Sequence, residues 1–150
     1  MSSACAIAGR IPHSGEMCLL ERVESHDAAS IRCSTLSHQR TSHPLRLDGK
    51  LRCAAGLEYA AQAMALHAAL GEVGPGAPAG YLVAVRDLCC RAAHLDEDSG
   101  ALSVEAERLL GDAEQVIYRF SVRSSKRELL SGRATVILRA RQPTAGAAPG

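Results

Sequence analysis

Aromatic side chains are almost missing from this sequence, whose 150 residues include no Trp, one Phe and three Tyr. Apolar residues still make up 47% of the chain, so Ala, Leu and Val must supply most of the buried surface. Because these side chains are small, the elements that they join must approach one another closely. We therefore expect a single thin core, which a chain of this length can build as one domain.

An excess of charge of either sign is also missing, as are long apolar runs. The 17 Lys and Arg residues nearly balance the 16 Asp and Glu residues, and a net charge of +1 favours neither nucleic acid nor a membrane surface as a partner. No apolar stretch approaches the ~18 residues of a membrane span, and residues 1–9 lack the pattern of a secretory signal. These features predict a cytoplasmic protein with a flexible N-terminus over residues 1–10, one domain over 11–140 and a disordered tail over 141–150.

Cysteine pairs of the CxxC type are absent as well. The adjacent Cys89 and Cys90 suit neither a zinc knuckle nor a disulfide framework. We predict that the cysteines are small buried hydrophobic residues in a reducing compartment, and that the protein holds no metal and no cofactor. The six residues concerned are Cys5, Cys18, Cys33, Cys53, Cys89 and Cys90.

One long helix between two groups of strands is predicted by the pattern that is present. Residues 53–70 are rich in Ala, contain no Pro and no β-branched residue, and are followed by Gly71, which is typical of a helix end. Residues 17–37 predict two short strands with a turn near His26. Four further Val-rich and Ile-rich segments predict an antiparallel meander; they read GYLVAVRDLCC, ALSVEAERLL, EQVIYRFSVR and SGRATVILRA. The fold class is therefore α+β, with a curved sheet wrapped around a single helix.

Glu58 and Gln62 are the polar residues of this helix that attract interest. Their spacing of four places puts both on one helix face, and Glu58 lies in the first turns, where the helix dipole favours an anion. Taken alone, the pair is better explained by ordinary charge placement at a helix start than by a catalytic role.

The segment RCAAGLEYAAQAMA resembles the central-helix motif of β-hydroxyacyl-acyl carrier protein dehydratases of the FabA/FabZ type. In that motif an acidic residue is followed four places later by Gln, and Glu58 and Gln62 occupy those places. The segment IPHSGEMCLLERVES is similar to the opening motif of the same family, which His13 and Arg22 match. The resemblance extends over about residues 11–139. It implies the hotdog fold, one long helix wrapped by a bent antiparallel sheet, normally paired as a dimer.

The resemblance also implies a reaction, the loss of water from a 3-hydroxyacyl thioester on acyl carrier protein to give the trans-2-enoyl thioester. A base must remove the proton next to the thioester, an acid must protonate the leaving hydroxyl, and donors must polarise the carbonyl. Glu58 is expected to act on the hydroxyl and Gln62 to orient its carboxyl group. The helix start at Ala55, Gly56 and Leu57 is expected to offer backbone N–H groups, with Gly56 leaving room for the substrate.

The base is where the chain departs from the family. The family has a Gly-His-Phe-Pro segment whose His lies 14 residues before the acidic residue, and this position is Pro44 here. His43, one place away, is the first candidate for the base, and His38 is the second. The alternative is that both are solvent-facing loop histidines. His67, nine residues after Glu58, is expected to be a packed helix histidine.

The departure is shared with a divergent dehydratase-like group of aryl-polyene and related pigment biosynthesis clusters, whose H/N-P-L-R motif is similar to residues 43–46. Some members of that group are thought to pair with a second, more conventional dehydratase subunit. The resemblance therefore leaves open a homodimer or a heterodimer with a second hotdog subunit. In the heterodimer, the partner could supply the base that is displaced here.

A cluster of basic residues precedes the helix, and acyl carrier protein is acidic. Arg46 is the preferred candidate for docking the carrier, ahead of Arg40, Lys50 and Arg52 and, from the following strand, Arg86 and Arg91. The alternative is that these are ordinary solvated loop charges. Two other functions compete with dehydration, a hotdog thioesterase and a non-catalytic subunit that shapes a partner's site.

Overall fold

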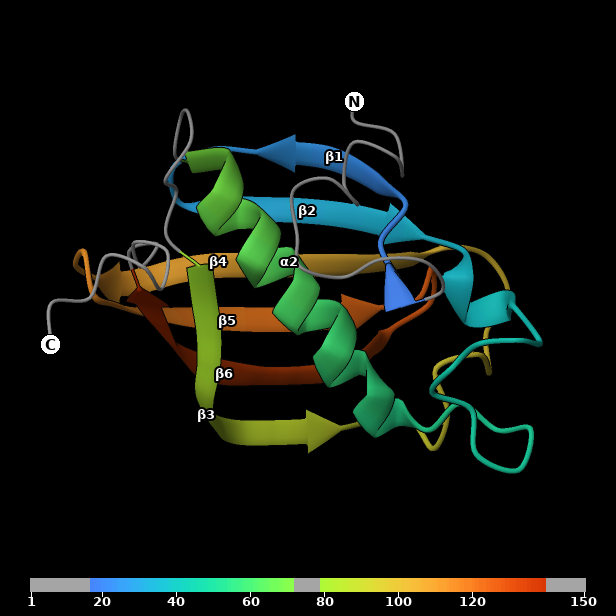
Figure 1. Cartoon of the computed structure of the whole chain (residues 1–150). Helices are drawn as coiled ribbons and strands as arrows, with labels where there is room; N and C mark the ends of the chain where they lie inside the picture. Colours follow the sequence, from blue (N-terminus) through green and yellow to red (C-terminus); the bar gives the residue numbers. More distant parts are fainter. Residues whose placement is uncertain (1–16, 72–78, 140–150) are drawn as a thin grey trace, which may run out of the picture.

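In the described part of the chain, one α-helix lies across one face of a six-stranded antiparallel sheet (Figure 1). The computed structural model describes residues 17–71 and 79–139. The predicted flexible N-terminus, the predicted tail, Cys5, His13 and most of the Gly and Pro cluster after the helix lie outside these residues. The strands are β1 (Arg22–His26), β2 (Ser30–Thr35), β3 (Ala79–Cys90), β4 (Leu102–Gly111), β5 (Gln115–Arg123) and β6 (Glu128–Arg139).

The helix α2 (Gly56–Gly71) confirms the predicted element. It is preceded by a 3-10 turn, η3 (Cys53–Ala55), so the helical region begins at the predicted residue and ends one residue later. The face toward the sheet carries Ala60 and Ala63, both with no exposed surface. Because these residues end at Cβ, the helix and the sheet can lie close together, which is the thin core that the composition predicts.

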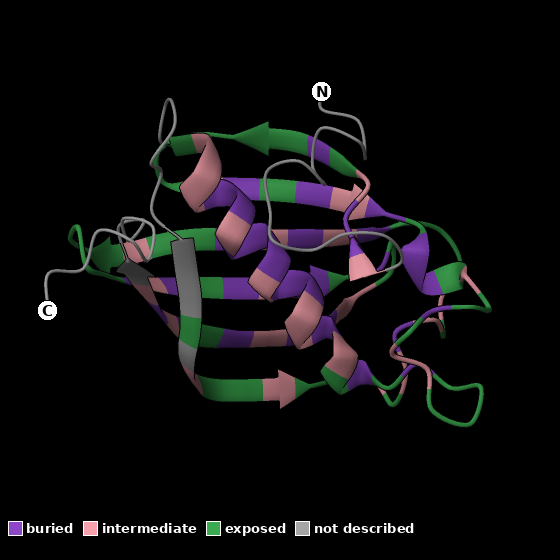
Figure 2. Cartoon of the chain, viewed as in Figure 1, coloured by how far each residue is buried: buried purple, intermediate pink, exposed green. Residues whose placement is uncertain are grey.

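Strand β5 shows the predicted alternation most clearly. Its even-numbered residues from Val116 to Val122 are buried, whereas Arg119 is exposed on the opposite face. Figure 2 shows the same division across the sheet, with buried residues on the strands behind the helix. This architecture is the hotdog fold that the sequence resemblance implied.

The predicted four-stranded meander is wrong in one respect, the place of β3. The strand order is β1-β2-β4-β5-β6-β3, so β3 pairs with β6 at the edge of the sheet and not with β4. The meander consists of β4, β5 and β6, which are joined by the short connections 112–114 and 124–127. The longer connection 91–101 lets the chain cross the sheet between β3 and β4. Alternating residues indicate that a strand exists, but they do not identify its neighbour.

The cysteines are only partly as predicted. Cys18, Cys33 and Cys53 are buried, and burial raises the pKa of the Cys33 thiol to about 12. Cys89 is half-buried and Cys90 is exposed, so the expectation that all cysteines are buried is wrong. The two residues end the edge strand β3 just beyond an irregularity in its pairing with β6, where no strand among the described residues lies on the other side of β3.

Gly132 of β6 is a position where the fold tolerates no side chain. A Cβ atom there would lie 2.8 Å from Cζ of the buried Phe120 ring and 3.3 Å from the Arg86 carbonyl oxygen. We expect Gly132→Ala to lower the free energy of unfolding by about 1–3 kcal/mol, because the ring or the strand must shift. Urea unfolding measures this. Gly71→Ala is the matched control, because no atom of the described residues lies within 4 Å of its Cβ position, and a similar loss there would contradict the packing argument.

Within residues 17–71 and 79–139, no helix is long and apolar enough to cross a membrane.

Candidate functional site

Glu58 and Gln62 meet on one face of α2, as their spacing of four places predicts. The Gln62 side-chain amide nitrogen, Nε2, lies 3.4 Å from Glu58 Oε1, as expected for residues one turn apart. The Glu58 side chain is partly exposed and Gln62 is fully buried. A half-accessible carboxyl group held by a buried carboxamide can meet a substrate and still keep a defined orientation.

Gln62 also connects the helix to the segment that leads into β1. Its Oε1 accepts the backbone N–H of Leu19 at 2.9 Å, and its Nε2 donates to the carbonyl of Met17 at 2.6 Å. A backbone N–H can only donate and a carbonyl can only accept, so these two contacts determine which way the carboxamide points. The NH2 group is thereby directed toward Glu58.

His43 is buried, with 4% of its surface exposed, so the alternative of a solvent-facing histidine is wrong for this residue. Its Nδ1 accepts the backbone N–H of Leu45 at 3.1 Å, and its Nε2 lies 2.9 Å from the Tyr59 hydroxyl. Because Nδ1 accepts, the ring proton is on Nε2 and is donated to Tyr59. Neither ring nitrogen therefore presents a free lone pair to a substrate in this conformation.

The pKa of His43 lies below the ordinary value of 6.5, first because of burial and then because of the nearby Arg46 and Arg40 guanidinium groups. The imidazole is thus neutral at physiological pH, in agreement with a ring nitrogen that accepts a hydrogen bond.

His38 is buried more completely, with no exposed surface. It lies in the short 3-10 turn η2 (Ser37–Gln39), and its Nε2 is 3.0 Å from the carboxamide nitrogen of Gln39. Its Nδ1 makes no hydrogen bond of normal geometry with any residue that the structure describes. Burial lowers the pKa of His38, although the Gly100 carbonyl and Asp96 oppose this. The alternative of a solvent-facing histidine is wrong here as well.

These two histidines predict how stability depends on pH. Their folded-state pKa values lie below 6.5, so the unfolded chain binds protons more readily as the pH falls through that value. The free energy of unfolding should therefore be highest above pH 7 and decrease as the pH is lowered through 6.5 toward the folded-state pKa values. Urea unfolding at pH 8, 7, 6 and 5 measures this. His43→Gln should make the dependence shallower, and a stability that does not change over this range would contradict the buried, neutral state.

The start of α2 differs from the expected set of open donors. The N–H of Ala55 is bonded to the Arg52 carbonyl at 3.0 Å, and the N–H of Gly56 is bonded to the carbonyls of Cys53 and Ala54. The expectation that Ala55 and Gly56 offer free N–H groups is therefore wrong, because the 3-10 turn η3 uses them. Leu57, the third residue of that set, is half-buried and packs against the core.

Gly56 has a packing role that the sequence did not reveal. A Cβ atom at this position would lie 2.8 Å from Cδ2 of Leu130 and 3.3 Å from Cδ2 of Leu95. Its missing side chain thus makes room for core residues below the helix. The expectation that Gly56 leaves room for the substrate is not supported, because the space beside it faces the sheet.

Arg46 is a largely enclosed residue that holds together the loop preceding the helix. Its Nε donates to the Arg40 carbonyl and its Nη2 to the His38 carbonyl, at 2.8 and 2.9 Å. Its Nη1 contacts the Gly49 carbonyl and forms an ion pair with Asp96 at 3.0 Å. Only 13% of the side chain is exposed. The proposed docking residue is thus engaged within the chain at every nitrogen.

Other members of the basic cluster are more accessible. Arg40 pairs with Glu21 and Arg91 with Glu128, and both guanidinium groups remain partly exposed. Lys50, Arg52 and Arg86 are exposed. These residues, rather than Arg46, keep surface that an acidic partner could contact.

His67 is a packed helix histidine, as predicted. Its Nε2 lies 2.8 Å from the Asp27 carbonyl and its Nδ1 lies 2.7 Å from the Tyr118 hydroxyl. Since a carbonyl only accepts, the ring proton is on Nε2, and Nδ1 accepts from Tyr118. The residue joins the helix to the turn between β1 and β2.

Tyr59 and Ser37 are site residues that the sequence interpretation missed. The Tyr59 hydroxyl, which accepts the hydrogen bond from His43, lies 2.7 Å from Ser37 Oγ, and neither residue has any exposed surface. Burial raises the pKa of Tyr59 to about 12, so its phenol keeps its proton. The available signal was a lone Tyr in a helix of Ala, because a buried phenol requires a hydrogen-bond partner.

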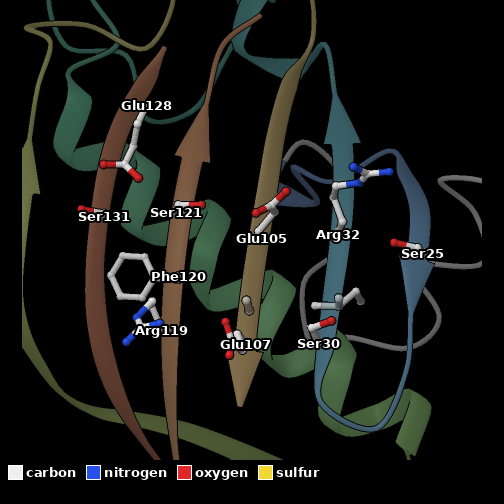
Figure 3. Close-up of a pocket in the computed structure, with 12 residues that line it drawn as sticks. Ser25, Ser30, Arg32, Glu105, Glu107, Arg119, Phe120, Ser121, Glu128 and Ser131 are labelled. Carbon is white, nitrogen blue, oxygen red and sulfur yellow. The ribbon is translucent and has the colours of Figure 1, made fainter. Parts of the chain in front are cut away.

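The opposite face of the sheet carries a shallow cavity of about 460 Å³ (Figure 3). Charged and small polar side chains line it, among them Arg32, Glu105, Glu107 and Arg119. None of the residues predicted for the site lines this cavity. The helix lies behind the strands in this view, so the cavity and Glu58 are on different sides of the sheet. A polar outer face is usual for an antiparallel sheet that covers one core.

Metal binding is not indicated in the part of the chain that the structure describes, where no three His, Cys, Asp or Glu side chains are grouped to hold an ion.

Comparison with known proteins gives a family match and several similar structures. The sequence matches the ApeP-like family, described as ApeP dehydratase, over residues 5–145. A chain of the dehydratase heterocomplex ApeI:P from Xenorhabdus doucetiae is similar in structure with a TM-score of 0.75 and 22% identity, over 93% of this chain and 92% of that chain. A search of curated proteins found no match.

Thioesterases are also similar in fold. A thioesterase from Haemophilus influenzae has a TM-score of 0.64 and 11% identity, over 97% of this chain and 96% of that chain. A hypothetical thioesterase from Streptococcus pneumoniae, solved with coenzyme A, has a TM-score of 0.61 and 11% identity, over 81% and 88% of the two chains. At these identities the likeness concerns the fold alone.

Proposed function

Because the chain belongs to the ApeP-like family of dehydratases, we propose that it takes part in removing water from a 3-hydroxyacyl thioester carried on acyl carrier protein. The product is the trans-2-enoyl thioester, and the setting is fatty-acid-like or aryl-polyene biosynthesis. The observation that carries the proposal is the Glu58 carboxyl group, partly exposed and oriented by the buried Gln62 carboxamide.

The chemistry assigned to Glu58 is that of the acid. Elimination breaks the C–O bond at C3 while a base takes the proton from C2, and the leaving hydroxyl needs a proton to depart as water. A carboxyl group that is protonated before the reaction gives its proton to that hydroxyl. Gln62 keeps the carboxyl group in place while the charge on it changes.

The base belongs, in this proposal, to a partner subunit. His43 and His38 remain the sequence candidates, but both rings are buried and the two nitrogens of His43 are engaged by Leu45 and Tyr59. The similar chain from X. doucetiae was solved as part of a heterocomplex. We propose an analogous assembly, a heterodimer with a second hotdog dehydratase, because the alternative, a homodimer, would bring only the same two buried histidines. The edge strand β3, which pairs with β6 on one side only, offers backbone groups for such an assembly.

Mass spectrometry of a 3-hydroxyacyl carrier protein tests the proposal. The carrier is incubated with this chain alone, with a candidate partner alone, and with both. Loss of one water that needs both chains supports the shared site. If the purified chain alone dehydrates the substrate at a normal rate and His43→Ala abolishes this activity, the partner-dependent version is wrong.

A hydrolase is the second candidate, favoured by the similarity in fold to thioesterases. In that reaction the carboxylate would activate or position a water molecule against the thioester carbonyl. Release of a free thiol, followed with a thiol-reactive dye after mixing with an acyl thioester, distinguishes it from dehydration, which leaves the thioester intact.

A further inference from the structure

Glu58 and His43 are linked by two hydrogen-bonded chains that meet at the Leu19 backbone, one at its carbonyl and the other at its N–H. From His43 the first chain passes through the Tyr59 hydroxyl and the Ser37 hydroxyl to the Leu19 carbonyl, with distances of 2.9, 2.7 and 2.7 Å. From the Leu19 N–H the second chain runs through Gln62 to Glu58, at 2.9 and 3.4 Å. The side chains between the two ends, those of Tyr59, Ser37 and Gln62, have no exposed surface.

The direction of every proton in the first chain follows from its neighbours. Leu45 N–H occupies Nδ1 of His43, so Nε2–H donates to Tyr59. Since the Tyr59 oxygen accepts this hydrogen bond, its own O–H donates to Ser37 Oγ. The Ser37 O–H in turn donates to the Leu19 carbonyl, because a carbonyl can only accept. The hydrogen bonds from His43 to the Leu19 carbonyl all point the same way, so they polarise and strengthen one another as far as that carbonyl.

These hydrogen bonds hold the Leu19 backbone in place. Its carbonyl receives the hydroxyls of Ser37 and Thr35, and its N–H determines the orientation of the Gln62 carboxamide. A displaced Leu19 would release Gln62 Oε1 and leave the amide oriented by the bond from Nε2 to the Met17 carbonyl, so the NH2 group would be held less firmly toward Glu58.

We propose that Tyr59 and Ser37 are positioning residues that orient Glu58 by acting through the Leu19 backbone and Gln62. The inference rests on the proposed function, because it assigns the two residues to the site in which Glu58 acts. Both are buried, so neither contacts the substrate, and their removal affects how fast bound substrate reacts rather than how it binds.

Tyr59→Phe tests this, with Tyr118→Phe as the matched control. Both variants remove a buried phenol that contacts a histidine, at 2.9 Å for His43 and 2.7 Å for His67, but only Tyr59 is linked to Glu58 through the Leu19 backbone. In the assembled enzyme, Tyr59→Phe is expected to lower kcat about tenfold with KM within about twofold. Ser37→Ala should do the same, and the double variant should lose no more than about either single one, because both break one chain. Tyr118→Phe should leave kcat unchanged.

A second measurement does not depend on activity. In ¹⁵N NMR spectra, the side-chain NH2 signals of Gln62 should shift or exchange faster in Tyr59→Phe and stay unchanged in Tyr118→Phe. If the wild-type assembly never dehydrates a substrate, the proposed function fails while this readout still tests the chain. The inference is overturned if the Gln62 signals are the same in Tyr59→Phe and the wild type, or if the two Tyr variants lose kcat equally.

Discussion

Glu58→Gln is expected to lower the rate of dehydration by the assembled enzyme about 10²–10⁴-fold, the usual contribution of a general acid. The carboxamide has nearly the size of the carboxyl group and a similar helix propensity, so the helix should be retained. It cannot give up a proton to the leaving hydroxyl. The loss should appear mainly in kcat, measured as release of water from the carrier-bound substrate by mass spectrometry.

Glu107→Gln is the matched control for this variant. Glu107 lies on β4 among the residues of the outer cavity, on the far side of the sheet from Glu58 (Figure 3). The same chemical change there should leave the rate within about twofold, since it removes no group from the reaction. An assembled complex that stays fully active with Glu58→Gln would instead support the non-catalytic subunit and contradict the assigned acid.

Arg46→Ala is expected to lower the free energy of unfolding by about 2 kcal/mol, because it leaves the carbonyl of the buried His38 and other, partly exposed acceptors without a donor. The carbonyls of His38, Arg40 and Gly49 lose their guanidinium contacts, and Asp96 loses its ion pair. The loop that contains His43 should loosen as a result. Urea unfolding of the variant and the wild type measures the difference.

Two further variants separate this structural role from docking of the carrier. Arg40→Ala removes a more exposed ion pair with Glu21, and it should cost at most about 1 kcal/mol. Arg46→Lys keeps the charge but cannot reach four acceptors with one ammonium group, so it should lose most of the stability that Arg46→Ala loses. If Arg46→Ala leaves stability unchanged but weakens carrier binding in a salt-dependent way, Arg46 docks the carrier as predicted and does not stabilise the loop.

The elements of the fold could be predicted because their signals are local. An Ala-rich stretch without β-branched residues forms a helix almost wherever it is placed, and α2 with its preceding turn lies where it was expected. The alternation in β5 likewise has a local cause. The position of β3 could not be predicted in this way, because pairing with β6 depends on contacts between residues far apart in the chain.

In the candidate site, too, the local contacts could be predicted and the contacts between distant segments could not. The contact between Glu58 and Gln62 follows from a spacing of four on a helix, which any helix would bring together. The surroundings of His43 follow from no local rule, because Tyr59, Ser37 and Leu19 come from three separate segments. His43, which looks solvent-exposed among Ser, Thr and Arg in the sequence, is in fact buried, with its two ring nitrogens bonded to Leu45 and Tyr59.

The sequence by itself determined the helix, the strands and the carboxyl group that the helix presents, since each depends on residues within one or two turns of one another. It also determined the thinness of the core, through side chains too small to fill a thick one. The tertiary structure alone decided three further features. Arg46 holds its loop together through backbone contacts, Gly56 makes room for Leu130, and His43 begins a chain of buried hydrogen bonds. The reason is that buried polar groups must find partners, and those partners exist only once distant segments have packed together.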